Sequence, residues 1–149
     1  MGALATGSDE IMNDHLSSPA SGAEPAPATL DPRGLDAIRT LDPERHCRLV
    51  EEAVTIYLDD APVRMEQMAA GLHSGDAEAL RRAAHTLKSA SANMGAERLA
   101  AQCNELESGA RDGDLHVCAS LLAAAQQEYG RVAAALRQVP EMRADHVTP

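Results

Sequence analysis

The residues best suited to chemistry lie in the segment "RRAAHTLKSASANMGAERLA", residues 81–100. His85 is followed three positions later by Lys88, the only lysine in the chain, and is preceded about one helical turn earlier by Arg81 and Arg82. Nearby cations disfavour a further positive charge, so the imidazole is expected to stay neutral at pH 7. A neutral imidazole can attack a phosphoryl group, and the cations can stabilise the negative charge that is added.

The position of His85 on its helix follows from the periodicity of the segment. The helix is expected to begin after Asp76, an N-cap residue, and to end at Gly95. At about 100° per residue, His85 falls about 150° from the middle of an apolar stripe. The stripe consists of Leu80, Ala83, Ala84, Leu87, Ser91 and Met94. His85 is therefore predicted to face solvent, and the short side chains of Ser89 and Ala92 leave room for another protein.

The other elements that must position this helix are also predicted to be helices. Asp31-Pro32 and Asp42-Pro43 each place an N-cap residue before a proline at the first helical position. The first pair starts a short helix, and the second starts a long one that Pro62 kinks or breaks. Two more helices are expected, over residues 96–113 and after Asp114. The sequence predicts an all-α fold: an antiparallel up-down-up-down four-helix bundle with a short extra N-terminal helix.

Composition divides the chain into three regions. Residues 1–30 are rich in Gly, Ala, Ser and Pro without sustained periodicity, which is typical of a flexible linker or tail. Residues 31–139 contain the predicted bundle, and residues 140–149 are expected to be a disordered C-terminal tail. The leader also suits a segment that joins this domain to a larger protein.

Bulk properties exclude several classes of protein. A chain of 149 residues provides about one domain, which leaves no room for an ATP-binding kinase domain as well. The formal net charge of −10 argues against nucleic-acid binding. No apolar run approaches the about 18 residues that a membrane-spanning helix needs, so we expect a cytoplasmic protein without direct membrane contact. The sequence contains neither a nucleotide-binding glycine loop nor a second catalytic base beside His85.

Metal binding and simple docking are the competing interpretations. His46 is adjacent to Cys47, and His116 is two residues from Cys118, but neither pair has the spacing of a zinc site. We therefore predict no metal bound by this chain. A helical module that docks partner proteins without carrying phosphate remains the alternative to a phosphoryl carrier.

The segment "AHTLKSASANMGAERLAAQCNELE" resembles the signature of histidine-containing phosphotransfer (HPt) domains. The pattern of that family is His-x-Leu-Lys-Gly, with a Gly-Ala or similar pair several residues later. The matching positions are His85, Leu87, Lys88, Gly95, Ala96, Leu99 and the stretch from Cys103 to Glu107. The resemblance extends over about residues 30 to 138, and one departure is Ser89, where the family most often has glycine.

The resemblance implies a phosphorelay intermediate rather than an enzyme with its own kinase activity. His85 would accept a phosphoryl group from the aspartate of a response-regulator receiver domain and pass it to another receiver. Lys88 would stabilise the phosphohistidine. Supporting residues would be Ser89, Arg81, Arg82, Arg111 and Glu107. Partner docking would use Ser89, Ala92 and Gly95.

The resemblance also implies the cofactor and the partners. Mg²⁺ would be supplied by the receiver, since the sequence shows no carboxylate cluster on the His85 face. A hybrid sensor histidine kinase is a further partner, or the protein from which such a domain comes, and the chain itself is expected to be a monomer. Family members often have an amide near the position of Glu107, where a carboxylate would hydrogen-bond the imidazole but repel the phosphate.

Overall fold

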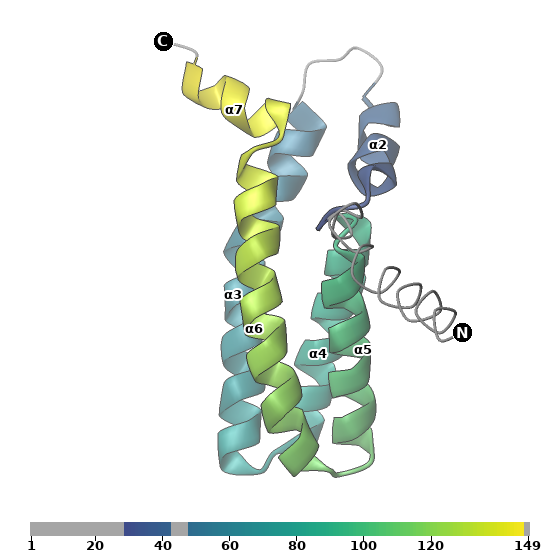
Figure 1. Cartoon of the computed structure of the whole chain (residues 1–149), viewed down its shortest axis with the longest axis vertical. Helices are drawn as coiled ribbons and strands as arrows, with labels where there is room; N and C mark the ends of the chain where they lie inside the picture. The colour runs from purple at the N-terminus through teal and green to yellow at the C-terminus, as the bar shows by residue number, and fades with distance from the viewer. Residues whose placement is uncertain (1–28, 43–47, 148–149) are drawn as a thin grey trace, which may run out of the picture.

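The computed structural model describes residues 29–42 and 48–147, with side chains described as far as Arg143. The helices in these ranges are α2 (Pro32–Thr40), α3 (Arg48–Ser74), α4 (Ala77–Asn93), α5 (Glu97–Arg111), α6 (Leu115–Arg137) and α7 (Pro140–Val147). Helices α3 to α6 run alternately up and down the long axis, and α2 and α7 lie at one end (Figure 1). The predicted all-α four-helix bundle with a short N-terminal helix is confirmed, and no strand occurs among the described residues.

Three of the helices begin at an aspartate, as the sequence predicts. Asp31, Asp76 and Asp114 each accept a backbone N–H from the first turn that follows, over 3.0, 3.0 and 3.2 Å. These bonds satisfy N–H groups that the first turn of a helix leaves without an internal partner. The predicted start at Asp42-Pro43 involves residues 43–47, which lie outside the described residues.

Helix α3 passes through Pro62 without a break. It is continuous over 27 residues, so of the predicted kink or break at Pro62 the break does not occur. Pro62 lies on the exposed side of the helix, while Tyr57, Ala61 and Met65 on either side of it are buried. The packing of these side chains outweighs the loss of one backbone hydrogen bond at the proline.

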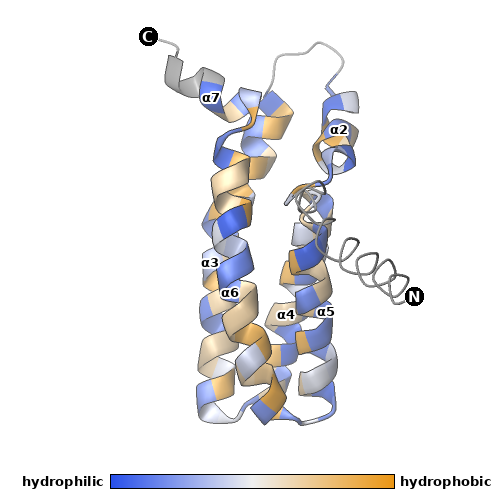
Figure 2. Ribbon diagram, viewed as in Figure 1, coloured by the Kyte–Doolittle hydropathy of each residue, from blue (hydrophilic) through white to orange (hydrophobic). Residues whose placement is uncertain are grey.

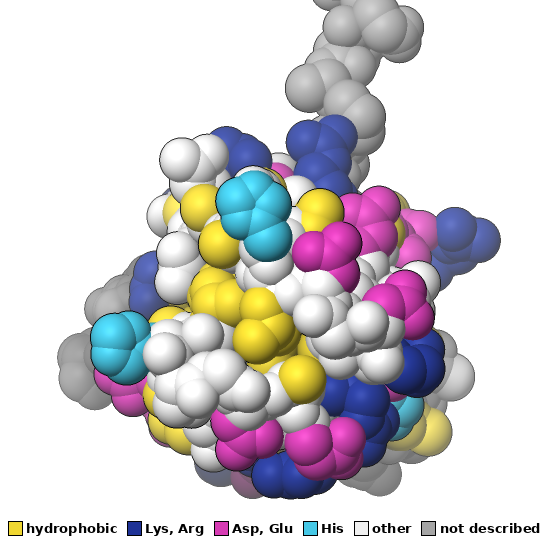
Figure 3. All heavy atoms as spheres, turned by 90° about the horizontal axis from the view of Figure 1, so that it is seen from below, with side chains coloured by type: hydrophobic (Ala, Val, Ile, Leu, Met, Phe, Trp, Pro, Cys, Tyr) yellow, Lys and Arg dark blue, Asp and Glu magenta, His cyan; other side chains and the backbone are white. Residues whose placement is uncertain are grey.

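The core is formed mainly by aliphatic and small side chains, because the chain contains no Phe or Trp. Tyr57 and Tyr129 contact each other with ring centroids 6.1 Å apart, and the Tyr57 hydroxyl lies 2.8 Å from Oγ of buried Ser91. Hydrophobic and hydrophilic residues alternate along the long helices (Figure 2). At the end that carries the α3–α4 and α5–α6 connections, hydrophobic side chains gather at the centre, with charged ones around them (Figure 3).

Helix α2 fills a space that the unequal lengths of the bundle helices leave open. α3 and α6 have 27 and 23 residues, whereas α4 and α5 have 17 and 15. At about 1.5 Å per residue, α4 is about 15 Å shorter than α3, and α5 is about 12 Å shorter than α6. The chain at the start of α2 lies on the α4–α5 connection, where the Asp31 N–H donates to the Gly95 carbonyl over 2.7 Å.

The expectation of a disordered tail over residues 140–149 is wrong for residues 140–147, which form α7. Glu141 of α7 is buried and pairs with Arg39 of α2, with Nε–Oε2 and Nη2–Oε1 distances of 2.6 and 2.9 Å. A helix of this length is marginal by itself. The paired group is 102 residues away in the sequence, so no local pattern could have shown this contact.

The close approach of α2 to Gly95 predicts that this glycine is required for stability. Gly95 has φ +84°, and an added Cβ would collide with the Asp31 carbonyl oxygen. Gly113 has a similar φ of +77°, but nothing lies within 4 Å of an added Cβ. We expect Gly113→Ala to lower the free energy of unfolding by about 1 kcal/mol, because alanine disfavours a positive φ. Gly95→Ala should lower it by about 3 kcal/mol, since its Cβ would also collide with the Asp31 carbonyl.

Denaturant unfolding of both variants, followed by circular dichroism, measures the two costs. Equal losses of stability in Gly95→Ala and Gly113→Ala would contradict the packing of α2 against the α4–α5 connection.

Candidate functional site

His85 lies in the middle of α4, on the side that faces away from the core. Leu80, Ala84 and Leu87 on the opposite side are 0% exposed, whereas the His85 side chain is 57% exposed. The predicted solvent-facing position of His85 is therefore confirmed. One edge of its ring is open to an approaching molecule.

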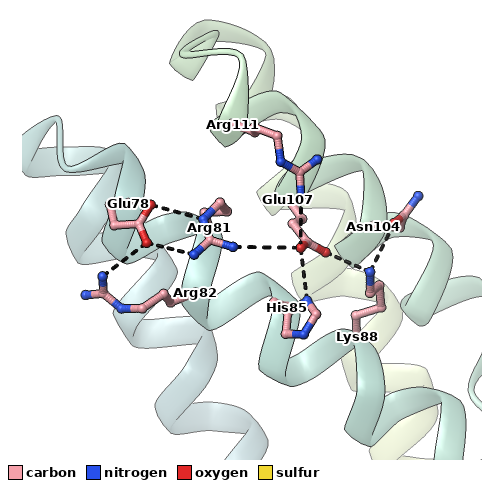
Figure 4. Close-up of polar contacts among 8 residues, drawn as sticks. All are labelled: Glu78, Arg81, Arg82, His85, Lys88, Asn104, Glu107 and Arg111. Carbon is pink, nitrogen blue, oxygen red and sulfur yellow. Dashed lines mark hydrogen bonds and ion pairs between the residues drawn. The ribbon is translucent and has the colours of Figure 1, made fainter.

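The other edge of the ring is held by Glu107, a residue of α5 whose side chain is only 6% exposed. Nδ1 of His85 lies 2.9 Å from Oε2 of Glu107. An ionised carboxylate can only accept hydrogen bonds, so Nδ1 carries the proton and donates it. In the neutral ring, Nε2 then has a free lone pair, and Figure 4 shows this nitrogen directed away from Glu107. The contact thus determines which nitrogen is nucleophilic.

Three cations surround the Glu107 carboxylate in addition to the ring. Nζ of Lys88 lies 2.7 Å from Oε1, and one guanidinium nitrogen of Arg111 lies 3.2 Å from Oε2. Arg81 is more distant, at 4.0 Å from Oε2. Lys88 also donates a hydrogen bond of 3.3 Å to Oδ1 of Asn104. The close-up in Figure 4 shows these groups converging on one carboxylate between α4 and α5.

The cations keep Glu107 ionised although it is buried. The Lys88 ammonium has the largest effect and lowers the pKa of Glu107 below its ordinary value, while burial raises it and the His85 contact lowers it further. The net direction is downward, because the charged form gains partners that the neutral form would lose. Glu107 is therefore a permanent acceptor for the Nδ1 proton at neutral pH.

Helical spacing and one short turn bring these side chains together. His85 and Lys88 are three residues apart on α4, and Asn104, Glu107 and Arg111 follow one face of α5 at steps of three and four. The two helices are antiparallel neighbours joined at Gly95. Residues at comparable distances before and after such a turn face each other across the pair.

The structure brings some of the expected supporting residues to His85 and places others elsewhere. Glu107, Arg111 and Arg81 belong to the cluster at the ring. Ser89 and Ala92 are exposed on the following turns of α4. Gly95 is buried beneath the start of α2, so its expected part in partner docking is corrected to a structural role.

The three cations expected around His85 are each paired with a carboxylate. Arg81 lies 2.7 Å from a carboxylate oxygen of Glu78, and Arg82 lies 3.4 Å from the same oxygen. Lys88 is paired with Glu107. Carboxylates therefore compensate the cations on this face, and Glu78 does so from one turn earlier on α4.

Asn104 is a member of the site that the sequence analysis missed. Its Oδ1 is a hydrogen-bond acceptor for Lys88 and holds the ammonium beside Glu107. The available signal was its spacing, since Asn104 precedes Glu107 by three residues and so shares its face of α5.

Neither metal binding nor a membrane span has support in the described part of the chain. No group of three or more His, Cys, Asp or Glu side chains there is arranged to hold a metal ion. Cys118 is fully buried while His116 is exposed, and His46 and Cys47 lie outside the described residues. No helix in these ranges is both long and apolar enough to cross a membrane.

Comparison with known proteins places this geometry in a family. Residues 52–138 match the family model of the Hpt domain. The fold is similar to the crystal structure of histidine-containing phosphotransfer protein B (HptB) from Pseudomonas aeruginosa PAO1, with a TM-score of 0.67 and 33% sequence identity. That match covers 79% of this chain and 98% of the HptB chain. No curated protein matches the sequence.

The chain belongs to the Hpt family, which confirms the resemblance found in the sequence. Proteins of this family are phosphotransfer carriers and not kinases, and they interact with response-regulator receiver domains in phosphorelays. The protein is accordingly a component of two-component signalling.

Proposed function

We propose that this protein is a phosphorelay intermediate in which His85 accepts a phosphoryl group from a receiver aspartate and passes it to a second receiver. The observation that carries the proposal is the geometry of the ring. Its Nδ1 is 2.9 Å from the Glu107 carboxylate, and its Nε2 is on the accessible edge. This arrangement suits a nucleophile that acts without a catalytic base, since Nε2 has no proton to lose.

The transfer step would be an in-line displacement at phosphorus. The Nε2 lone pair attacks, the bond from phosphorus to the aspartate oxygen breaks, and the receiver carboxylate leaves with that electron pair. Lys88 and Arg111 lie on the same side of the protein as the ring and can attract the phosphoryl oxygens. The hydroxyl of exposed Ser89 is a further donor on the next turn.

The receiver would dock over α4 and the adjoining edge of α3. Ser89 and Ala92 are exposed and short, so a partner can approach the helix closely. Beside them, Ile56 is 66% exposed at the rim of a groove of about 280 Å³ that runs between α3 and α4. Val63, seven residues further along α3, is 45% exposed and extends the apolar edge. Apolar edges next to small residues favour protein association.

We propose that the Mg²⁺ of the reaction belongs to the receiver. The carboxylate nearest to His85 is Glu107, and Lys88, Arg111 and the ring already surround it. This donor set does not fit a divalent cation, which needs several free oxygen ligands.

The phosphoryl group would originate from a hybrid sensor histidine kinase. The carrier would act as a cytoplasmic monomer, consistent with a bundle that buries its own apolar faces.

Phosphorylation tests the role of His85 directly. The full chain is incubated with a panel of phosphorylated receiver domains and Mg²⁺, and labelled phosphate on the chain is measured after acid and after base treatment. We expect acid-labile, base-stable label on the wild type and on His116→Gln, a control at another exposed histidine. His85→Gln should carry none. Label on His85→Gln would contradict the assignment, and no label on the wild type would favour a docking module.

Lys88→Ala tests the proposed stabilisation of the phosphoryl group. We expect phosphorylation to be about 10- to 100-fold slower, because a cation near the transferred group is lost. The variant should also lose about 1–3 kcal/mol of stability, since Oε1 of buried Glu107 loses its partner. Arg82→Ala, which removes a cation that is paired with Glu78, is the control. Equal transfer rates in Lys88→Ala and Arg82→Ala would contradict the role.

Ala92→Arg tests the docking surface separately from the chemistry. The long side chain should obstruct a receiver and reduce transfer from it at least about tenfold, while a small donor such as phosphoramidate still labels His85. Ala123→Arg, at an exposed position on α6, is the matched control and should transfer like the wild type. Unchanged transfer from receivers to Ala92→Arg would show that the docking surface lies elsewhere.

A further inference from the structure

Large apolar side chains are exposed in a row along the outside of helix α3. Five such side chains are exposed in the described part of the chain, and three of them, Leu49, Ile56 and Val63, lie on α3. They follow one another at intervals of seven residues, and exposed Ala70 continues the series. Seven residues are close to two helical turns, so these side chains form one row about 30 Å long. A row with this spacing is typical of a helix that packs against another helix.

A row of carboxylates runs beside the apolar row. Glu52, Asp59 and Glu66 are exposed, and each follows a member of the apolar row by three residues. Residues three apart are neighbours on the surface of a helix. None of these three carboxylates takes part in a hydrogen bond or an ion pair within residues 29–42 and 48–143. Their charges are therefore available to a partner.

The arginines of α3 do not neutralise the carboxylate row. The helix contains five acidic residues and only two arginines. Arg64 is held by Asp60, with Nε–Oδ2 and Nη2–Oδ1 distances of 3.0 and 3.1 Å, on the side of α3 that faces α4. Arg48, the first residue of the helix, lies one turn before Glu52 and far from the other two carboxylates of the row. The outer face of α3 is thus apolar along its centre and negative along one edge.

Charge decides what can cover this face. A second copy of the chain would bring the same carboxylates together in a protein whose net charge is −10, and like charges at a contact oppose association. Residues 1–28 contain four acidic residues and neither lysine nor arginine, so this segment is not complementary either. The complement is a helix with apolar residues at seven-residue intervals and with lysine or arginine beside them.

The apolar row borders the helix that carries His85. Ile56 lines a hollow of about 280 Å³ together with Ala90 of α4. Further along α3, Ala70 lines a hollow of about 510 Å³ together with Thr86, the residue next to His85. A protein that lays a helix along the row therefore also lies against the side of α4 next to the phosphoacceptor. A receiver domain must reach His85, so it is the partner that fits both contacts.

We propose that the outer face of α3 selects among receivers. The apolar row takes a receiver helix with apolar residues at seven-residue intervals, and Glu52, Asp59 and Glu66 pair with lysine or arginine beside them. Receivers whose docking helix lacks these cations are disfavoured. This inference rests on the proposed function and adds the residues that determine which receivers are served, which the assignment of a phosphoacceptor does not contain.

The test is the salt dependence of transfer in variants that differ in where three charges are removed. The full chain is mixed with Mg²⁺ and the phosphorylated receiver that labels the wild type fastest, at about 50 and about 500 mM NaCl. The second-order rate constant of labelling is measured for the wild type and two triple variants. One neutralises the carboxylate row by Glu52→Gln, Asp59→Asn and Glu66→Gln. The control neutralises three exposed carboxylates of α5 and its end by Glu97→Gln, Glu105→Gln and Asp112→Asn.

We expect the row variant to be labelled about tenfold more slowly than the wild type in low salt, because an attraction between charges is lost. In high salt the two should agree within about twofold, since screening removes that attraction from the wild type as well. The control should stay within about twofold of the wild type at both concentrations. A row variant that is labelled as fast as the control in low salt, or a loss of rate that salt does not reduce, would overturn the inference.

Charge reversal tests the sign of the charge on the partner. Glu52→Lys, Asp59→Lys and Glu66→Lys together should slow labelling by the same receiver about 100-fold in low salt. A receiver in which the basic residues of its docking helix are changed to glutamate should then label the reversed variant faster than the wild type. If no surface helix of the receiver gives this exchange of preference, the inference is wrong.

Two further measurements separate this inference from the proposed function. Phosphoramidate needs no docking helix and should label His85 of every variant at the wild-type rate, so slower labelling of the row variant would overturn the inference. Sedimentation should show a monomeric wild type, whereas a dimer that Ile56→Arg dissociates would show that a second copy covers the row, which overturns the inference alone. Failure of phosphoramidate and of every receiver to label the wild type at His85 would overturn the proposed function together with the inference.

Discussion

The buried carboxylate of Glu107 connects the chemistry of this protein to its packing. It lies between α4 and α5, 2.9 Å from the ring of His85 and 2.7 Å from the ammonium of Lys88. A carboxylate in such a place is unfavourable unless its partners compensate the lost hydration. The same contacts that make its burial tolerable also fix the tautomer of the ring and hold the lysine. Stability and reactivity at this site therefore depend on one set of distances.

Those distances are set by the α4–α5 pair, which the rest of the bundle holds in place. The two helices turn sharply at Gly95, and the start of α2 lies on that turn. α2 in turn is connected to α7 by the Arg39–Glu141 ion pair. The long helices α3 and α6 complete the core and leave the outer face of α4 open. A helical hairpin packed beneath an accessible face suits a phosphotransfer carrier.

Much of this arrangement could be predicted from local sequence. The apolar stripe of α4 put His85 on the solvent side, and Asp31, Asp76 and Asp114 marked helix starts. Local patterns failed where the outcome depends on contacts between distant segments. The sequence suggested that Glu107 would lie near the ring, but the pairing of its carboxylate with Lys88 depends on how α4 and α5 pack.

Contacts between distant segments also explain why the sequence predicted neither helix α7 nor the burial of Gly95. Residues 140–147 have a weak helical pattern, and the ion pair from Glu141 to α2 spans 102 residues. Gly95 fits the family's motif, but its burial beneath α2 depends on how a separate helix packs. At Pro62, side-chain packing keeps the helix unbroken although the local rule allows a break there.

The most direct measurement on the central claim is nuclear magnetic resonance of the phosphorylated chain labelled with ¹⁵N at histidine. Long-range proton–nitrogen spectra and nitrogen–phosphorus coupling show which ring nitrogen carries the phosphoryl group and which carries the proton. If Glu107 orients the ring as described, phosphorus is bonded to Nε2 of His85 and the proton remains on Nδ1. Phosphorus on Nδ1, or on another residue, would contradict the account.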